Sequence, residues 1–206
     1  MILETLMVGH MEANCYILAC EQTKRAAVID PGGDAAEILA TVERLAVKVE
    51  YIICTHGHAD HIGAVAKVKT VTGAKVLIHS ADAAMLTDPQ KNLSAFIGNP
   101  FATTPADQLL ADGDVITVGN LKLEIINTPG HTPGGICIKV EGRLFSGDTL
   151  FSGSVGRSDF PGGSHSDLIK GIKEKLLTLP GETTVYPGHG PDTTIEQEMK
   201  RNPYLK

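Results

Sequence analysis

Residues 51–61 place four possible metal ligands within six positions. The segment reads Tyr-Ile-Ile-Cys-Thr-His-Gly-His-Ala-Asp-His, so His56, His58, Asp60 and His61 directly follow an apolar run. Residues at i and i+2 of an extended segment point to the same side, which pairs His56 with His58. Imidazole and carboxylate groups suit Zn, Mn or Fe, whereas Ca and Mg prefer shells made almost wholly of oxygen. The cluster therefore predicts a metal site, with helix capping by Asp60 as the simpler alternative.

The sequence around this cluster predicts a strand before it and a helix after it. Tyr51 to Cys54 are apolar and rich in strand-forming residues. Beyond Ala59, apolar residues recur at helical spacing as far as Gly73, a residue typical of helix ends. Ligands in open α/β sheets bind where a strand ends and a helix begins, so this position suits a binding site.

Three later loops share one design, in which an apolar strand ends in glycine and a single His or Asp follows. His131 lies within Pro-Gly-His-Thr-Pro-Gly, Asp148 within Ser-Gly-Asp-Thr, and His189 within Pro-Gly-His-Gly-Pro. Glycine allows the backbone to approach closely at such turns. Each loop alone is weak evidence, and an aspartate such as Asp148 in a turn is more often a hydrogen-bonding turn residue than a metal ligand. Together with the first cluster they predict seven metal ligands: His56, His58, Asp60, His61, His131, Asp148 and His189.

Seven ligands suit two metal ions that share a carboxylate. The expected partition gives one ion to His56, His58 and His131, and the other to Asp60, His61 and His189. Asp148 would then bridge the two ions. The remaining histidines have simpler interpretations: surface or capping roles for His10, in an early turn, and His79, at a strand end. For His165, before a helix, capping is the default and a place at the rim of the site is the alternative.

Composition indicates an ordinary globular protein. The chain has 206 residues, of which 42% are hydrophobic and 20% charged, and one domain over 1–206 is expected. A net charge of -6 argues against a general nucleic-acid binder. No segment has transmembrane length, and no secretory signal is visible. The four cysteines form no Cys-x-x-Cys pair and are expected to be small buried hydrophobes, which favours a cytoplasmic location.

Apolar spacing predicts strands and helices in both halves of the chain, 1–108 and 109–206. Helices are expected after a cap at Asp34, from the metal cluster to Gly73, after a cap at Ser80, and over 166–177, followed by a polar C-terminal segment. Residues 88–108 are expected to form a long loop and a wall of the site. Neither half has enough helices to cover both faces of a sheet. Two sheets packed face to face with helices outside are therefore expected, in the α/β class.

The four motifs, in this order, resemble the metallo-β-lactamase superfamily. That resemblance implies an αβ/βα four-layer sandwich, with two mixed β-sheets flanked by helices and the metals at one edge. Within the superfamily, the chain looks most like short, bacterial glyoxalase II-like hydrolases (hydroxyacylglutathione hydrolase-like). The segments that support this are Pro31-Gly32-Gly33, residues 156–160 (Gly-Arg-Ser-Asp-Phe) and residues 202–205 (Asn-Pro-Tyr-Leu). Zinc β-lactamases commonly have Cys where Asp148 stands.

The resemblance implies hydrolysis of small thioesters of the S-lactoylglutathione type, by a hydroxide that bridges two divalent ions. Zinc is the first expectation, with iron or manganese as alternatives. Asp60 is the expected catalytic residue, because it can accept a hydrogen bond from the nucleophile as well as ligate. Arg157 is the candidate substrate-binding residue, with a loop-anchoring role as the alternative. Thr55 or Asp30 could orient ligands. Neither nucleic acid nor a membrane is an expected partner.

Two other functions remain open at this point. Persulfide dioxygenases share Gly-Arg-x-Asp-Phe with residues 156–160, and they hold a single iron with the equivalents of His56, His131 and Asp148. A metal-binding protein with a silent site is the non-enzymatic alternative. Two ions per chain favour the hydrolase, and one iron favours the dioxygenase.

Overall fold

The computed structural model describes all 206 residues and contains two six-stranded mixed sheets. The first sheet has the order β1-β2-β3-β4-β5-β6, with β3 to β6 parallel and β1 to β3 antiparallel. Its elements are β1 (Ile2–Val8), β2 (Ala13–Ala19), β3 (Arg25–Ile29), α1 (Ala35–Arg44), β4 (Lys48–Ile53), α2 (Ala59–Ile62), α3 (Val65–Thr72), β5 (Lys75–His79), η1 (Ser80–Thr87), η2 (Ser94–Phe96) and β6 (Gln108–Leu110).

The second sheet has the order β14-β13-β10-β9-β8-β7, with β10 and β13 parallel and its other neighbours antiparallel. Its elements, together with a small β11–β12 hairpin, are β7 (Val115–Val118), β8 (Leu121–Asn127), β9 (Ile136–Val140), β10 (Arg143–Gly147), β11 (Leu150–Phe151), β12 (Ser154–Val155), α4 (His165–Gly171), η3 (Ile172–Leu176), β13 (Thr184–Pro187), β14 (Thr193–Thr194), α5 (Ile195–Arg201) and η4 (Pro203–Leu205).

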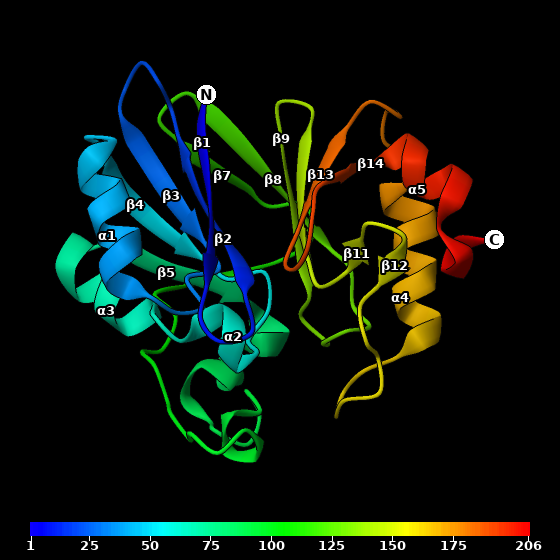
Figure 1. Ribbon diagram of the computed structural model, residues 1–206, viewed down its shortest axis with the longest axis horizontal. Coiled ribbons are helices and arrows are strands. Elements are labelled where there is room, and N and C mark those ends of the chain that lie inside the picture. Colours follow the sequence, from blue (N-terminus) through cyan, green and yellow to red (C-terminus); the bar gives the residue numbers. More distant parts are fainter.

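Three apolar layers hold the sandwich together. The central layer lies between the sheets and contains residues from both, such as Leu18, Ile53, Ile125 and Phe145. One outer layer packs α1 and α3 on the first sheet, and the other packs α4, η3 and α5 on the second. Figure 1 shows the result, with α1 and α3 outside one sheet and α4 and α5 outside the other. The expected α/β sandwich of two mixed sheets flanked by helices is confirmed.

Side-chain patterning explains why the strands take these places. In β8, Leu121 and Leu123 are buried while Lys122 and Glu124 are exposed, the period of two expected for a strand with one apolar face. β7 alternates in the same way, and the two strands pair around a two-residue turn at Gly119, whose φ of 59° favours glycine. β2 is instead buried along its whole length, because one of its faces packs in the central layer and the other in an outer layer.

The expected helix that follows the metal cluster is divided in two. α2 ends at Ile62, and α3 begins at Val65 and ends at Gly73, which has φ 71° as a helix-terminating glycine does. The backbone N–H of Ala64 donates to Pro31 O at 2.8 Å, so the loop after β3 interrupts the helical hydrogen-bond ladder. The prediction of one continuous helix was wrong at this point.

Other predicted caps and boundaries also need correction. Asp34 precedes α1 but does not cap it, because its carboxylate accepts a hydrogen bond from Gly9 N at 2.7 Å instead. His79, rather than Ser80, caps η1 by accepting from Ala81 N. Ser164, and not His165, caps α4. The C-terminal segment contains α5, which a predominantly polar sequence did not reveal, and β6, β11, β12 and β14 were too short to predict. No helix here combines the length and the apolar character needed to cross a bilayer.

Candidate metal centre

Five strands end at one edge of the sandwich, and the loop after each strand contributes to the site. All seven predicted ligands meet there. The loops supply Asp30 after β3, His56 to His61 after β4, His131 after β8, Asp148 after β10 and His189 after β13. Carboxyl ends of neighbouring parallel strands lie at the same edge, which explains why residues so far apart in sequence converge.

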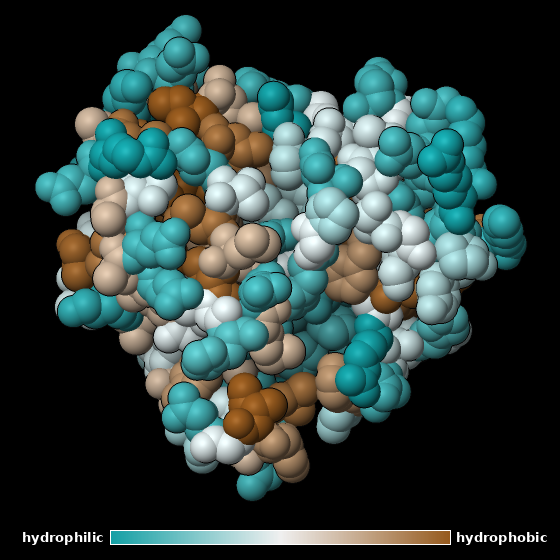
Figure 2. Space-filling model, viewed as in Figure 1, coloured by the Kyte–Doolittle hydropathy of each residue, from teal (hydrophilic) through white to brown (hydrophobic).

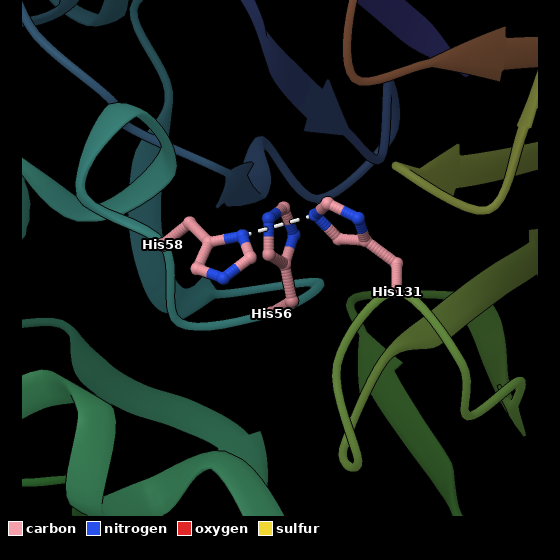
Figure 3. Close-up of side chains that lie close together, drawn as sticks. All are labelled: His56, His58 and His131. Carbon is pink, nitrogen blue, oxygen red and sulfur yellow. Dashed lines mark hydrogen bonds between the residues drawn. The ribbon is translucent and has the colours of Figure 1, made fainter. Parts of the chain in front are cut away.

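The first predicted ligand set is brought together. The possible ligand atoms of His56, His58 and His131 all lie within 4.8 Å of one another, and the three side chains are buried. Figure 3 shows the rings pointing toward a common point, two from the loop after β4 and one from the loop after β8. His58 Nδ1 and His131 Nε2 are 2.9 Å apart. Two nitrogens on one tetrahedral zinc would be separated by roughly 3.3 Å, so this spacing is near the one a shared ion requires.

The second predicted set is brought together in the same way. Asp60, His61 and His189 offer ligand atoms that also lie within 4.8 Å of one another. His189 Nε2 is 3.1 Å from Asp60 Oδ2 and 3.3 Å from His61 Nε2. The two sets are neighbours, because the ring centroids of His56 and His61 are 4.2 Å apart.

Asp148 lies between the two sets. Its Oδ1 is 3.4 Å from His61 Nε2 in the second set. Its Oδ2 is 3.6 Å from His131 Nε2 in the first set and 3.8 Å from His189 Nε2 in the second. The Asp148 carboxylate therefore faces both sets, with Oδ1 near the second set and Oδ2 between the two, as the predicted bridging position requires.

Two buried polar atoms of the site have no hydrogen-bond partner. They are His56 Nε2 and Asp148 Oδ1, two of only three such side-chain atoms in the chain. Buried polar atoms are almost always paired, so two orphans in one site call for a missing partner. A neutral imidazole nitrogen and a carboxylate oxygen each have a lone pair that can bind a cation. The clusters of histidine and aspartate therefore fit divalent metal ions.

The pKa values of His56 and His58, in the first set, favour metal binding. Burial, reinforced by the neighbouring His61, lowers the pKa of His56 well below its usual value. Burial and the nearby His131 lower the pKa of His58 to about 3. Both imidazoles are therefore neutral at pH 7, the form that binds a metal ion.

The second set holds more charge. Burial alone would raise the pKa of Asp60, but His61 and His189 outweigh it and hold that pKa well below the usual range. Burial opposes protonation of His61, yet the carboxylates of Asp148 and Asp60 prevail and raise its pKa to about 10. The hydrogen bond to Asp60 is also the main reason why the pKa of His189 is raised. Without a metal, protons on His61 and His189 neutralise part of the acidic charge; a bound cation would take their place.

Asp30 fixes the ring of His61. Its Oδ2 accepts from His61 Nδ1 at 3.0 Å and from Thr55 Oγ1 at 2.6 Å, and its Oδ1 accepts from Thr55 N at 2.7 Å. A proton held on Nδ1 leaves Nε2 of His61 free to ligate, which is how a second layer of contacts usually orients a metal-binding histidine. The expectation that Asp30 and Thr55 orient ligands agrees with this geometry.

The loop that holds His131 is fixed from two sides. His131 Nδ1 donates to Arg157 O at 2.6 Å, which leaves Nε2 facing the site. Asp82 is fully buried and accepts from Thr132 Oγ1 and Gly134 N, both at 2.7 Å. Burial raises the pKa of Asp82 despite these hydrogen bonds. Asp82 lies in the 3-10 helix η1, and no sequence pattern around it indicates a role at the site.

The start of β2 fixes the loop that holds His189. Asn14 Nδ2 donates to Pro187 O at 3.0 Å and to Gly190 O at 2.9 Å, and Asn14 N donates to Gly188 O at 2.7 Å. Gly188 is required here, because a Cβ at that position would lie 2.2 Å from Asp148 Oδ1. Sequence reasoning missed Asn14, since an asparagine at the start of a strand is typical of an ordinary turn.

A cavity of about 800 Å³ opens onto the ligands. Besides His58, Asp60, His131, Asp148 and His189, its walls contain mainly apolar residues from the 88–108 loop and from residues 151–161. The long loop therefore forms a wall of the site, as expected. His10 and His165 do not line this cavity, and His165 contacts Ser158 instead.

Arg157 lines the same cavity but already has a partner. Its Nε and Nη2 donate to the two oxygens of Asp159, at 2.9 and 2.8 Å, and its guanidinium lies 4.4 Å from the ring centroid of Phe160. The side chain is 66% exposed. These contacts agree with the loop-anchoring alternative; a role in substrate binding stays a prediction.

A four-layer sandwich with two sets of metal ligands at one sheet edge defines a metal-binding protein of the αβ/βα class. Residues 8–189 match the sequence model of the metallo-beta-lactamase superfamily, and the chain belongs to that superfamily. Hydroxyacylglutathione hydrolase GloC of Haemophilus influenzae is 35% identical, with 100% of this chain and 98% of that protein covered. Probable metallo-hydrolase YqgX of Bacillus subtilis is 36% identical, with 96% and 94% covered.

Solved structures agree with this assignment. BLEG-1, a B3 metallo-beta-lactamase, is 39% identical and superimposes with a TM-score of 0.95 over 100% of both chains. TTHA1623, in a di-iron-bound form, is 33% identical with a TM-score of 0.87 over 98% of this chain and 100% of that one. ETHE1 from Myxococcus xanthus is 31% identical with a TM-score of 0.85 over 98% of this chain and 84% of that one.

Proposed function

We propose that this chain is a metal-dependent hydrolase that cleaves thioesters of the S-lactoylglutathione type. The observation that carries the proposal is the pair of three-ligand sets with Asp148 between them, at the floor of an open cavity. When bound, two divalent ions would supply a ligated water with a pKa near 7 and an electrophile for the substrate carbonyl. The similarity to hydroxyacylglutathione hydrolase GloC and to metallo-hydrolase YqgX supports the same class.

Different residues of the chain would hold the two ions and orient the attacking water. His56, His58 and His131 would hold one ion, and Asp60, His61 and His189 the other, with Asp148 shared. Asp60 stays ionised because its pKa is held low, so it can accept a hydrogen bond from an attacking water. A thiolate is a good leaving group, which explains why no separate general acid is needed.

Zinc is the proposed ion, and iron remains an alternative because TTHA1623 has been solved in a di-iron-bound form. A reducing, cytoplasmic location belongs to the same proposal, since all four cysteines are buried free thiols. The second candidate is a mononuclear-iron persulfide dioxygenase. Its three ligands would be His56, His131 and Asp148, which lie together here, with His131 Nε2 3.6 Å from Asp148 Oδ2.

Thiol release from S-D-lactoylglutathione tests the proposal directly. The protein would be loaded with Zn, Fe or Mn, its metal content measured, and the rate compared with that of Asp60→Asn at equal metal content. We expect hydrolysis at two ions per chain and a loss of about a hundredfold or more in the variant.

The other outcomes decide against the proposal. Oxygen uptake with glutathione persulfide at one iron per chain, without thioester hydrolysis, would replace it with the dioxygenase. Because BLEG-1 is a B3 metallo-beta-lactamase, a chromogenic β-lactam belongs in the same assay. Turnover of the β-lactam without turnover of the thioester would mean that the substrates are β-lactams and not thioesters.

A further inference from the structure

Three large apolar side chains stand exposed at the mouth of the metal cavity. Met11, Phe96 and Ile97 line it and are 55%, 73% and 58% exposed. We call these three residues the apolar lip. Single exposed apolar side chains are common, but several on one pocket indicate a contact surface. Figure 2 shows hydrophobic atoms gathered at the bottom of the molecule, where Figure 1 places the loop between β5 and β6.

The loop that carries Phe96 and Ile97 is tied firmly to the metal ligands. Asn92 and Ser94 are fully buried, and each hydrogen-bonds to Phe101 across the loop. The carbonyl of Asn92 also accepts from Ala59 N at 2.9 Å, between His58 and Asp60. The part of the lip that Phe96 and Ile97 form is therefore carried by a loop that hydrogen bonds hold next to the ligands.

Deeper in the cavity the walls are also apolar, with Phe151, Val155 and Phe160 among them. Apart from histidines, Arg157 is the one cationic residue of the lining, and both oxygens of Asp159 already engage it. The common thiol carriers are anionic through carboxylates or phosphates. Asp159 offsets the charge of this guanidinium through Nε and Nη2, so an anionic group would find a paired cation with only Nη1 unengaged, in a chain whose net charge is -6. Away from the metal ligands, the cavity thus offers mainly apolar surface and one cationic side chain whose charge Asp159 already offsets.

We propose that the site selects thioesters with an apolar acyl chain, which lies along the lip while the charged groups of the thiol carrier stay in solvent. The thiol carrier is anionic and the lining is mainly apolar, so the lining does not favour binding of the carrier. The acyl chain is then the part of the substrate that contacts the lip. This inference rests on the proposed hydrolase function and names the substrate class within it.

A series of acyl thioesters on one neutral thiol, N-acetylcysteamine, tests the chain-length dependence. With metal-loaded protein, we expect kcat/KM to rise from acetyl through butanoyl and hexanoyl to octanoyl. Burial of a methylene corresponds to roughly a fourfold gain when complete, so about two- to fourfold per methylene is expected in an open groove. S-D-lactoylglutathione should be a poorer substrate than hexanoylglutathione.

The lip itself is tested with a matched pair of methionines. Met11→Gln should lower kcat/KM for the octanoyl thioester about fivefold, a larger loss than the one for the acetyl thioester, whose acyl group is too short to lie along the lip. Met199→Gln is the control, because Met199 is 54% exposed and lies outside the cavity, and it should change neither rate. Phe96→Ser, on the same loop as Ile97, should act like Met11→Gln.

A binding measurement separates this inference from the hydrolase proposal. Calorimetry with non-hydrolysable S-methyl-, S-butyl- and S-octyl-N-acetylcysteamine should give affinities that rise with chain length and fall in Met11→Gln. Chain-dependent binding without hydrolysis of any thioester would overturn the hydrolase proposal and support the lip. Hydrolysis that prefers lactoyl over longer acyl groups, or that is insensitive to Met11 and Phe96, would overturn the lip and leave the hydrolase standing.

Discussion

Asp30 and Asp34 are two aspartates four residues apart, with similar backbone and different partners. Both have positive φ, 50° and 47°, a conformation that Asp and Asn tolerate better than most residues. Asp30 accepts from His61 and Thr55 at the metal centre, whereas Asp34 accepts only from Gly9 N. Substitutions at Asp30 and Asp34 can therefore be compared: the first changes a carboxylate that contacts a metal ligand, and the second changes one that contacts only the backbone of a turn.

Asp30→Asn should keep the fold and weaken the second metal site. An amide nitrogen in place of Oδ2 would make His61 Nδ1 an acceptor, and the ring proton would then occupy Nε2, the atom needed for ligation. The opposite amide orientation would set its N–H₂ against Thr55 N, a donor that Asp30 now satisfies. We expect the affinity for the second ion to fall about 10- to 100-fold, measured by metal titration and by content after dialysis.

Asp34→Asn serves as the control for this change. It should retain two ions at the affinity of the original protein, because Asp34 lies outside the ligand network. Two ions bound with unchanged affinity by Asp30→Asn would show that Asp30 does not control the tautomer of His61.

Single residues differ in how well sequence predicted them. The seven candidate ligands were predictable because their types are rare in apolar strand ends and because the Gly-rich loops repeat one pattern. Asp30 follows the same pattern, yet the sequence indicates it only as a residue that could orient ligands, since Asp-Pro-Gly-Gly is also a strong turn signal. Asp82 and Asn14 act through backbone groups of loops distant in sequence, and no local pattern encodes such contacts.

At the scale of elements, the β1–β2 hairpin is a support for the metal centre. Its second strand, β2, contacts the end of β13 and the loop after it through Asn14 and through Tyr16, whose hydroxyl donates to Pro187 O at 2.6 Å. An isolated bridge between Ala13 and His189 joins the same two segments. The first hairpin of the chain thereby positions the last predicted ligand.

Asn14→Ala should loosen this support. Gly190 O would lose its side-chain donor, and Pro187 O would keep only the Tyr16 hydroxyl, at a cost of about 1–3 kcal/mol in the free energy of unfolding. Urea denaturation of the metal-free protein would measure that loss, and metal titration should show weaker binding at the site that contains His189.

Asn120→Ala provides the comparison. Asn120 Nδ2 donates to Gln22 Oε1 on the exposed surface, so its removal should cost about 0.5 kcal/mol or less. Equal losses in the two variants, with unchanged metal affinity in Asn14→Ala, would contradict a supporting role for the hairpin.

Elements were predictable where they were long and periodic. The strands that carry the ligand loops show clear apolar runs, and the two-residue turn at Gly119 identified its hairpin. α5 escaped prediction because it has seven residues and buries only Ile195 and Glu198. Glu198 is a buried carboxylate that accepts from Gly153 N at 2.9 Å and from Thr193 Oγ1 at 2.7 Å. Its polar character concealed a packing role that only the tertiary structure defines.

At the scale of the whole molecule, each ligand set joins both halves of the chain. The first set takes His131 from the second half, and the second set takes His189 from it, while the other members of both sets follow β4 in the first half. Asp148 of the second half adds a contact to each set. Bound ions would thus link the two sheets at one edge of the sandwich.

Metal removal should therefore lower the thermal stability of the entire sandwich. Ligand that binds only the folded state adds about 2.7 kcal/mol per site at a hundred times its Kd. In a chain of this length, 1 kcal/mol shifts Tm by about 2–4 °C, so two occupied sites predict a shift of about 10–20 °C. Calorimetry before chelation, after it and after zinc is restored would measure the shift.

Asp30→Asn makes this prediction sharper, because it should keep one site at full affinity and weaken the other. Its shift on chelation should be about 60–75% of that of the original protein, within a single cooperative transition, since both sheets share the central apolar layer. An unchanged Tm after complete chelation would mean that the ions do not stabilise the fold. Two separate transitions would instead mean that the halves unfold independently and that the metal centre, more than the shared core, couples them.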